Sequence, residues 1–286
     1  MVFKTKDFAD FINTNYFPLK LDGNTDTGRQ IRNKWLVPGY PTMVLLTSNG
    51  EEIDRIVGFE GNKNNYFQLI KDYTAGKNTL KDLLTKVKND PENIQLNYNI
   101  ANKFNDRGDD RNALMYYENV LRYEPDHQSE IYLKSEFNVA ESKAYTEDEP
   151  QFLLHYAQNC TNKNLKYYAY SSLARFYSRK KDQTNVIKTY EEALVKLPEN
   201  ASLMNSYGWY IFQNEVADQY ERGIAVARQA VAIEPESDSI WDTLGQLLFA
   251  AGSVNEAIAA MQKAADLAPD EQSYQENLAR YQLSKK

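Results

Sequence analysis

The sequence predicts a mostly α-helical chain in which a solenoid of paired helices follows a short α/β segment. Two observations carry this prediction. An apolar run at 42–47, the pair Asn49-Gly50 and a second apolar run indicate a β-hairpin early in the chain. Behind it, prolines recur at intervals of 34, 73, 37 and 34 residues, at Pro91, Pro125, Pro198, Pro235 and Pro269. These intervals fit one unit of 34 residues with two irregularities, a period typical of helix–turn–helix repeats.

Composition and charge argue against two classes of protein. The chain has 286 residues, of which 33 are basic and 40 acidic, and a formal net charge of −7, which offers no electrostatic attraction to nucleic acid. No run of about 18 apolar residues is present, so we expect no insertion into a membrane. The acidic excess lies after residue 77, where the chain has 23 basic and 31 acidic side chains. A cationic partner and a soluble surface both account for it.

The first residues bear on where the protein works. Lys4, Lys6 and Asp7 interrupt any apolar core of a signal peptide, so the chain as encoded is expected to be soluble and cytoplasmic. Met1-Val2-Phe3, however, reads as the inside of a helix. A start codon assigned too late, or a fragment, would explain this, and a signal peptide further upstream would then export the protein to the periplasm.

The first 77 residues predict alternating helices and strands. We expect, in order, a helix that ends near Asn15, a strand at Phe17–Asp22, a helix at Gly28–Trp35, a buried strand at Met43–Thr47, a strand at Ile53–Phe59 and a helix at 62–74. The apolar face of the last helix comprises Tyr66, Leu69, Ile70 and Tyr73. Asn49-Gly50 predicts a type I′ turn, because both central residues of that turn need positive φ.

Gly39-Tyr40-Pro41-Thr42 lies just before the buried strand, and with this order of elements residues 1–77 resemble the second half of a thioredoxin-like domain. The resemblance implies a cis Tyr40-Pro41 bond in a loop that holds extended polypeptide in that family. It also implies a Cys-x-x-Cys pair further upstream, which this chain lacks, since its only cysteine is Cys160. We therefore expect no redox activity from the chain as encoded. Whether the reactive half was lost or lies upstream of Met1 stays open.

The missing half has a physical consequence as well. In the family a further strand lies between the equivalents of 17–22 and 42–47, and unpaired backbone groups in a buried edge cost about 1–3 kcal/mol each. Residues 1–35 are therefore expected to be poorly packed or rearranged. The hairpin 42–59 and the helix 62–74 should survive, because their pairing is local.

Residues 78–286 resemble a tetratricopeptide-repeat solenoid. The clearest unit reads Trp241-x-x-Leu244-Gly245-x-x-Leu248, followed by Ala257 and Met261. The expected units are 94–125, a divergent unit at 126–164, 167–198, 201–235 with a lengthened turn at Ala217–Tyr220, 238–269, and a capping helix at 271–284. In the divergent unit we expect helices at Ser129–Lys143 and Pro150–Cys160. A helix at Thr79–Lys88 reads as half a unit, which the helix 62–74 would complete.

The resemblance places ligands of such repeats in a groove lined by the first helix of each unit. The residues expected there are Asn102, Asn105, Arg175, Arg179, Asn205, Trp209, Phe212, Gln246 and Phe249. Arginine and aromatic side chains are typical of peptide hot spots. An equally good alternative has Phe212 and Phe249 packing between units. The Lys/Asn clamp of chaperone-binding relatives is not matched, because its positions hold Tyr98, Asn102, Ser172 and Ser206.

Other chemistry finds little support in the residues. His127 and His155 lie in no metal-ligand spacing, so we expect no metal site and no cofactor. Cys160 is a lone thiol and is expected to pack in the interior. No catalytic residues are predicted. Two functions remain: a repeat module that binds a protein or peptide and carries a silent thioredoxin-like remnant, or a fragment of a thiol–disulfide oxidoreductase of the thioredoxin-plus-repeat type.

Overall fold

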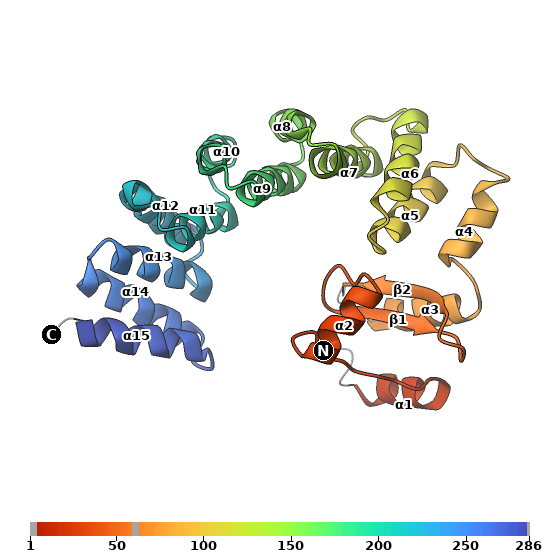
Figure 1. The fold of residues 1–286 in the computed structure, drawn as a ribbon, viewed down its shortest axis with the longest axis horizontal. Helices are drawn as coiled ribbons and strands as arrows, with labels where there is room; N and C mark the ends of the chain where they lie inside the picture. Colours follow the sequence, from red (N-terminus) through yellow and green to blue (C-terminus); the bar gives the residue numbers. More distant parts are fainter. Residues whose placement is uncertain (1–4, 59–62, 285–286) are drawn as a thin grey trace. The chain divides into compact units, whose positions relative to one another are not determined.

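The computed structural model describes residues 5–58 and 63–284, so the prediction made for Met1-Val2-Phe3 falls outside the described residues. The chain divides into two compact units, unit 1 over Met1–Ser142 and unit 2 over Lys143–Lys286. Most of the described residues are helical, and two short strands lie early in the chain (Figure 1). The fold is therefore mostly α, with helical repeats.

In unit 1 two helices, α1 (Lys6–Asn15) and α2 (Asp26–Lys34), precede a two-stranded antiparallel sheet of β1 (Thr42–Leu46) and β2 (Glu52–Val57). The register pairs Thr42 with Val57 and shifts at Leu45/Leu46. Helix α3 (Lys63–Thr74) packs its buried side chains against this hairpin. The core cluster there comprises Phe8, Leu45, Ile56, Tyr66, Ile70 and Tyr73. Helix α3 thus belongs to the core of the hairpin.

The hairpin turn is not the type I′ turn that we predicted. Gly50 has a φ of +80°, but Asn49 has no positive φ, whereas a type I′ turn needs both. The Thr47 N–H instead donates to the Glu51 carbonyl at 2.8 Å, and the Gly50 N–H donates to the Thr47 carbonyl at 2.9 Å. Glycine is required at this turn because position 50 alone adopts the left-handed conformation.

The strand predicted at Phe17–Asp22 is not formed. This segment lies outside the two-stranded sheet, and its apolar side chains face water, with Phe17 96% and Leu19 74% exposed. Alternating apolar residues form a strand only where a neighbouring strand satisfies their backbone groups. The sheet offers none to this segment. Helix α1, in contrast, contributes Phe8 to the core of the hairpin, so the expectation that residues 1–35 are poorly packed is wrong for this helix.

From α4 (Leu80–Val87) onward the chain consists of helices, most of them in pairs. The pairs are α5 (Ile94–Asn105) with α6 (Asp110–Tyr123), α9 (Lys163–Arg179) with α10 (Gln183–Lys196), α11 (Ala201–Gln213) with α12 (Tyr220–Ile233), and α13 (Asp238–Ala250) with α14 (Val254–Leu267). In sequence, α7 (Glu130–Thr146) and α8 (Pro150–Asn159) come between the first two pairs, and α15 (Gln272–Ser284) follows the last. The extra residues near Ala217 form a 3-10 turn, η2 (Ala217–Gln219), as the lengthened turn predicted. We call the first helix of each pair the A helix and the second the B helix.

The local sequence explains where these helices begin. Asn93, Asp109, Asp182 and Asn200 each precede a helix, and each side-chain oxygen accepts a backbone N–H of the first turn. Such caps satisfy donors that have no partner inside the helix. The repeated spacing of cap residues thus sets the boundaries of the pairs.

Small residues let the paired helices approach each other. A Cβ atom on Gly245 of α13 would lie 3.2 Å from Met261 Cε and 3.3 Å from the Met261 backbone nitrogen of α14. Ala257 and Met261 are fully buried at the same contact. Glycine is needed here for the close approach of two helices. No helix among the described residues is long and apolar enough to cross a membrane.

Candidate functional site

The exposed side of the A helices of unit 2 is the candidate site; we call it the A face. In Figure 1, α9 and α11 lie along one side of this unit, with α8, α10 and α12 along the other, and α13 follows α11. Seven of the predicted binding residues lie on these A helices: Arg175, Arg179, Asn205, Trp209, Phe212, Gln246 and Phe249. The A face begins with two cations on α9 and ends against α15.

On α11 the A face is aromatic and carries no charge. The rings of Trp209 and Phe212 lie 5.5 Å apart, and both side chains are half-buried. Asn205, one turn before Trp209, has a buried Oδ1 atom without a hydrogen-bond partner. The two rings therefore present apolar surface that is only partly covered within unit 2.

On α9 two exposed arginines form the basic part of the A face. The Arg179 guanidinium lies 4.9 Å from the centre of the Tyr145 ring. Burial of Tyr190 raises the pKa of its hydroxyl to about 12, and the positive charge of Arg175 nearby acts in the opposite direction. Both arginines remain exposed. Their charges are thus available to a ligand at the surface.

On α13 the predicted residues are largely occupied by α15. The Tyr281 hydroxyl donates to Gln246 Oε1 at 2.6 Å, and the rings of Tyr281 and Phe249 stack with centroids 4.0 Å apart. The Arg280 guanidinium lies 5.5 Å from the Phe249 ring. For Phe249 the structure therefore shows packing between elements, the alternative that the sequence left open.

Asp242 is the half-buried carboxylate of this helix. Burial raises its pKa to about 6; the amide of Gln246, which donates to it at 3.2 Å, acts in the opposite direction, and the charges of Asp238 and Glu271 add to the rise. The Asp238 carboxylate accepts the Tyr274 hydroxyl at 2.9 Å. The α13 part of the A face is therefore acidic, in contrast to α9.

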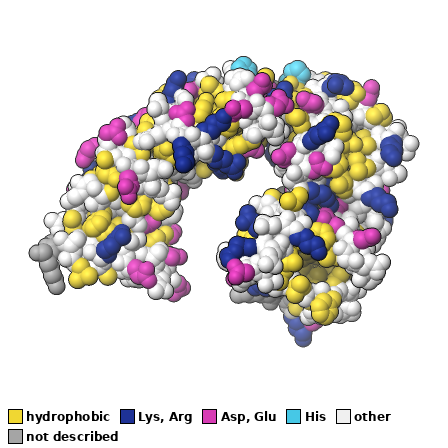
Figure 2. Space-filling model, viewed as in Figure 1, with side chains coloured by type: hydrophobic (Ala, Val, Ile, Leu, Met, Phe, Trp, Pro, Cys, Tyr) yellow, Lys and Arg dark blue, Asp and Glu magenta, His cyan; other side chains and the backbone are white. Residues whose placement is uncertain are grey.

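The space-filling view shows the same separation of charge. In Figure 2 Lys and Arg side chains gather over the region of α9, and Asp and Glu side chains edge the region of α13 and α15. The sequence of α11 between them has no ionisable acid or base other than tyrosine.

The remaining predicted binding residues lie in unit 1. Asn102 on α5 accepts the Tyr117 hydroxyl at 2.7 Å, so its side-chain oxygen already has a partner, and Asn105 is exposed. In the predicted loop the Tyr40-Pro41 bond is cis, and the Thr42 hydroxyl donates to the Gly39 carbonyl at 2.7 Å. Tyr40 is 59% exposed. These residues are not brought together with the A-face residues within one unit.

A buried charge cluster in unit 1 was not predicted. Asp54 of β2 is fully buried, and its carboxylate accepts Lys103 Nζ at 2.8 Å and Arg107 Nη2 at 2.7 Å. It also accepts the backbone N–H of Leu80 at 2.9 Å and of Arg55 at 2.8 Å. Burial alone would raise the pKa of Asp54, but the two cations hold it below its ordinary value.

Arg55 extends this cluster to the end of α2 and adds a second link to the end of α5. It donates to both carboxylate oxygens of Glu52, to the carbonyl of Trp35 at 2.9 Å and to the carbonyl of Asp106 at 3.0 Å. Only 4% of its side chain is exposed. The cluster therefore ties the hairpin to the end of α2, the start of α4 and the end of α5.

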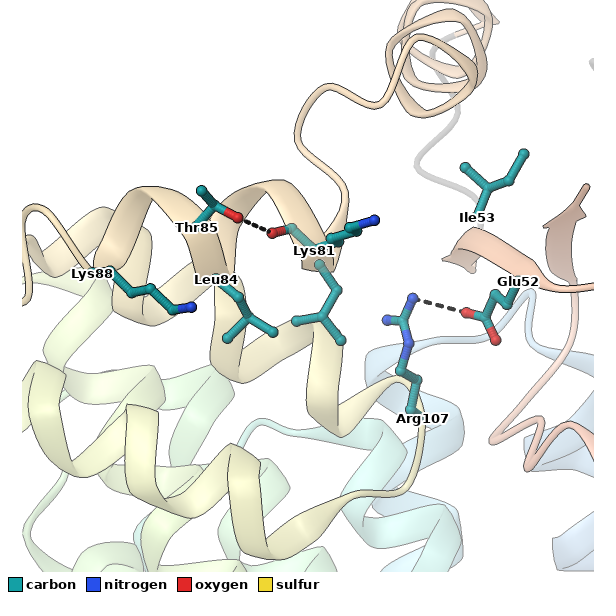
Figure 3. A pocket seen from close by; sticks show the side chains of 8 residues that line it. Glu52, Ile53, Lys81, Leu84, Thr85, Lys88 and Arg107 are labelled. Atoms are coloured by element: carbon teal, nitrogen blue, oxygen red, sulfur yellow. Dashed lines mark hydrogen bonds and ion pairs between the residues drawn. The ribbon is translucent and has the colours of Figure 1, made fainter.

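A shallow cleft opens beside this cluster. Figure 3 shows Arg107 reaching Glu52, with 2.8 Å between Nη2 and Oε1, while side chains of α4 line the other side. Leu80, Leu84 and Ile53 form its apolar part, and Lys81 and Lys88 are exposed at its edge. Arg107 is already paired with carboxylates, so the charges that the cleft offers to a ligand are those of Lys81 and Lys88 at its edge.

Cys160, His127 and His155, the side chains considered for metal or redox chemistry, contact tyrosine and asparagine side chains. Cys160 is buried, and its thiol lies 3.3 Å from the Tyr156 hydroxyl. The His127 ring stacks on Tyr132, and His155 Nδ1 lies 3.3 Å from the Asn159 amide. Within residues 5–58 and 63–284, no group of three or more His, Cys, Asp and Glu side chains could hold a metal ion.

Comparison with known proteins gives one family match and several solved structures. Residues 238–271 match the family model of the tetratricopeptide repeat. The structure of YrrB, described as a TPR protein with an unusual peptide-binding site, has a TM-score of 0.46 and 12% identity, covering 69% of this chain and 98% of its own.

Two further structures have lower scores. MamA of Desulfovibrio magneticus RS-1 has a TM-score of 0.39 and 20% identity, covering 67% of this chain and 85% of its own. A thermophilic TPR protein of Thermus thermophilus has a TM-score of 0.34 and 19% identity, covering 78% of this chain and 100% of its own. The search of curated proteins gives no match. The family match identifies residues 238–271 as a tetratricopeptide repeat, and the described residues before it form further helix pairs.

Proposed function

We propose that the chain is a module that binds a protein or peptide on the A face of its repeats and has no redox chemistry of its own. The observation that carries the proposal is the half-buried pair Trp209 and Phe212 on α11, next in the repeat order to the exposed Arg175 and Arg179 on α9. Aromatic and arginine side chains dominate the free energy of peptide binding where they are desolvated by the ligand. The family match at 238–271 supports a repeat of the kind that serves such contacts.

The experiment selects peptides from a random phage-displayed library on the full chain and measures their affinity by fluorescence anisotropy. Trp209→Ala should weaken the selected peptides by roughly 30-fold, since a hot-spot truncation costs about 2 kcal/mol or more. Phe152→Ala is the matched control, because Phe152 is an exposed aromatic on α8, outside the A helices α9, α11 and α13. Thermal unfolding of each variant is recorded alongside.

Two results would contradict the proposal. Selected peptides that bind Trp209→Ala and Phe212→Ala as tightly as the wild type would place binding elsewhere. A large loss of thermal stability in Trp209→Ala, equal to that of a core substitution, would assign Trp209 to the interior.

The alternative is a fragment of a thiol–disulfide oxidoreductase whose Cys-x-x-Cys half lies upstream of Met1. What favours it is the order of α1, α2, β1, β2 and α3 together with the Gly39-Tyr40-Pro41-Thr42 loop, which resembles the thioredoxin-like pattern. In the proposed module this segment is a silent remnant. An in-frame Trp-Cys-x-x-Cys in the DNA upstream of Met1 would favour the enzyme. Insulin reduction above a buffer control by the present chain would contradict the silent remnant.

A further inference from the structure

The charge of the three A helices of unit 2 changes sign along their order. Helix α9 has four cations, Lys163, Lys166, Arg175 and Arg179, and no carboxylate. Helix α11 has neither, and α13 has Asp238 and Asp242 and no cation. The B helices show no such trend. Helix α10, for example, has two lysines and two glutamates. The change of sign is therefore specific to the A helices.

A ligand on the A face would meet the charges that lie on that side of each A helix. Arg175 and Arg179 are four residues apart on α9, and Asp238 and Asp242 are four residues apart on α13, so each pair shares one side of its helix. The equivalent position to Arg175 in the next repeat, 34 residues on, is Trp209 of the uncharged α11. The A face thus presents two positive charges, then an aromatic pair, then two carboxylates.

The carboxylates of α13 are not neutralised within unit 2. Asp238, Asp242 and Glu271 repel one another, and burial adds to the cost of ionising Asp242. Arg280 is the one cation in the sequence of α15. Its guanidinium lies 5.5 Å from the centre of the Phe249 ring and 5.2 Å from the centre of the Tyr281 ring. No ion pair within the described residues joins it to either aspartate. This end of the A face therefore favours a ligand that brings positive charge.

The spacing lets a single extended peptide meet all three helices. Neighbouring helices lie about 8–10 Å apart, so the two steps from α9 to α11 and from α11 to α13 span roughly 20 Å. Arg175 and Arg179 end α9, whereas Asp238 and Asp242 begin α13. This offset of about eight residues adds about 12 Å along the helices, so about seven residues of extended chain, at about 3.3 Å each, cover the distance. The separation is more than twice the Debye length of about 8 Å at physiological salt, so the two ends act on the peptide almost independently.

Resting on the proposed function, we infer that the A face takes a peptide with opposite charges at its two ends. Its acidic end lies at Arg175 and Arg179 on α9, its apolar centre at Trp209 and Phe212 on α11, and its basic end at Asp238 and Asp242 on α13. A peptide with the same charge at both ends gains at one end and is repelled at the other. The charge order of the partner, as well as its apolar side chains, is therefore part of what the repeats recognise.

The test uses three pooled libraries of labelled peptides, each about nine residues long, with a centre drawn from Leu, Met, Phe, Trp and Tyr. One library has two Glu at one end and two Lys at the other, the second has Glu at both ends, and the third has Lys at both ends. Both chain directions of the first library are made, because the A face does not fix the direction of the backbone. Binding to the full chain is measured at low and at physiological salt.

The library of opposite charges should bind about tenfold or more tightly than either of the others, and the advantage should shrink as salt rises. In Arg175→Glu/Arg179→Glu both ends of the A face are acidic, so the library with Lys at both ends should become the tightest. Arg175→Gln/Arg179→Gln is the milder variant, which should remove the preference for an acidic end without reversing it. Lys196→Glu on the B helix α10 is the control, and it should leave the ranking unchanged.

The outcomes separate this inference from the function on which it rests. If the opposite-charge library is not the tightest, or if the arginine variants leave the ranking as it was, the charge order plays no part and the inference is wrong. If all three libraries bind equally and Trp209→Ala weakens each of them, the binding module stands without it. If Trp209→Ala weakens none, the proposed function fails first.

Discussion

The junction of the hairpin with α5 and the junction of α13 with α14 are both tightly packed, but by opposite means. At the first, Asp54, Lys103 and Arg107 are buried as charges that neutralise one another at 2.7–2.8 Å. At the second, Gly245 and Met261 meet as apolar surfaces with no room for a further methyl group. At the junction of α13 with α14, the steric fit of small and large apolar side chains defines the contact. The hairpin and α5 are unlike elements, and directional hydrogen bonds fix how they meet.

The largest expected effect breaks the charged junction. Asp54→Ala leaves Lys103 buried without a carboxylate and Arg107 paired with Glu52 alone, which should cost about 3–5 kcal/mol. Hydrogen exchange of the β2 amides measures the free energy of opening there without assuming two-state unfolding of the whole chain. Lys86→Gln is the control, because its pair with Asp82 is partly exposed and contributes at most about 1 kcal/mol. An equal, small effect of both variants would show that the buried cluster adds no stability.

The next effect breaks the apolar junction. Gly245→Val places side-chain atoms where Cβ alone would already lie 3.3 Å from a backbone nitrogen, so we expect a loss of about 1–3 kcal/mol. Hydrogen exchange of α13 and α14 amides measures it. Ala232→Val on the exposed side of α12 should change stability by no more than about 0.5 kcal/mol. A tolerated Gly245→Val would mean that α13 and α14 can separate at little cost.

A smaller effect concerns Asp242, a half-buried carboxylate without a cation, in contrast to Asp54. Its pKa of about 6 in the folded chain lies above the ordinary value of 3.8, so folding takes up a proton between these values and stability falls as pH rises through them. Asp242→Asn should therefore raise the free energy of unfolding of unit 2 at pH 7 by roughly 1 kcal/mol, allowing for its contact with water, and change little at pH 4. Urea unfolding at both pH values measures it, with Asp266→Asn on the exposed side of α14 as control. A gain that is the same at both pH values would be independent of the charge.

The smallest effect is expected at Phe17. Its side chain is 96% exposed, so Phe17→Ser should change the free energy of unfolding, measured by thermal unfolding, by less than about 0.5 kcal/mol. Phe8→Ser, in the core of the hairpin with 4% exposure, is the matched comparison and should be much more destabilising. A marked loss in Phe17→Ser would mean that this segment is buried against something in solution.

The sequence predicted the helix pairs well because their signals are local. The cap residues, the small residues such as Gly245 and the prolines all act within one repeat, and the extra turn near Ala217 lies where the spacing placed it. The strand at Phe17–Asp22 was wrong because strand formation depends on a distant partner. The turn at Asn49-Gly50 was wrong in type, since a single positive φ at Gly50 suffices for this hairpin.

The Asp54 cluster could not be predicted from spacing. Its partners lie 49 and 53 residues further along the chain, and nothing local to β2 indicates which cations would meet it. The signals that existed were an aspartate between Ile53 and Ile56 of a strand and two cations four residues apart at Lys103 and Arg107. On the A face the residue types were predictable, whereas the contacts of Gln246 and Phe249 with α15 depend on how the final helix packs.

The hydrogen bonds of Arg55 and Asp54 bear on where the chain can be divided. A polypeptide that ended at residue 77 would retain Asp54 but lose the amine and guanidinium that neutralise it, and a polypeptide that began at residue 78 would retain these cations without the carboxylate. Each piece would therefore expose charged side chains whose partners lie in the other piece. The smallest autonomous piece that contains the hairpin therefore extends to Arg107, just past α5. A protease that nicks the loop at residues 75–79 should leave two fragments that stay associated.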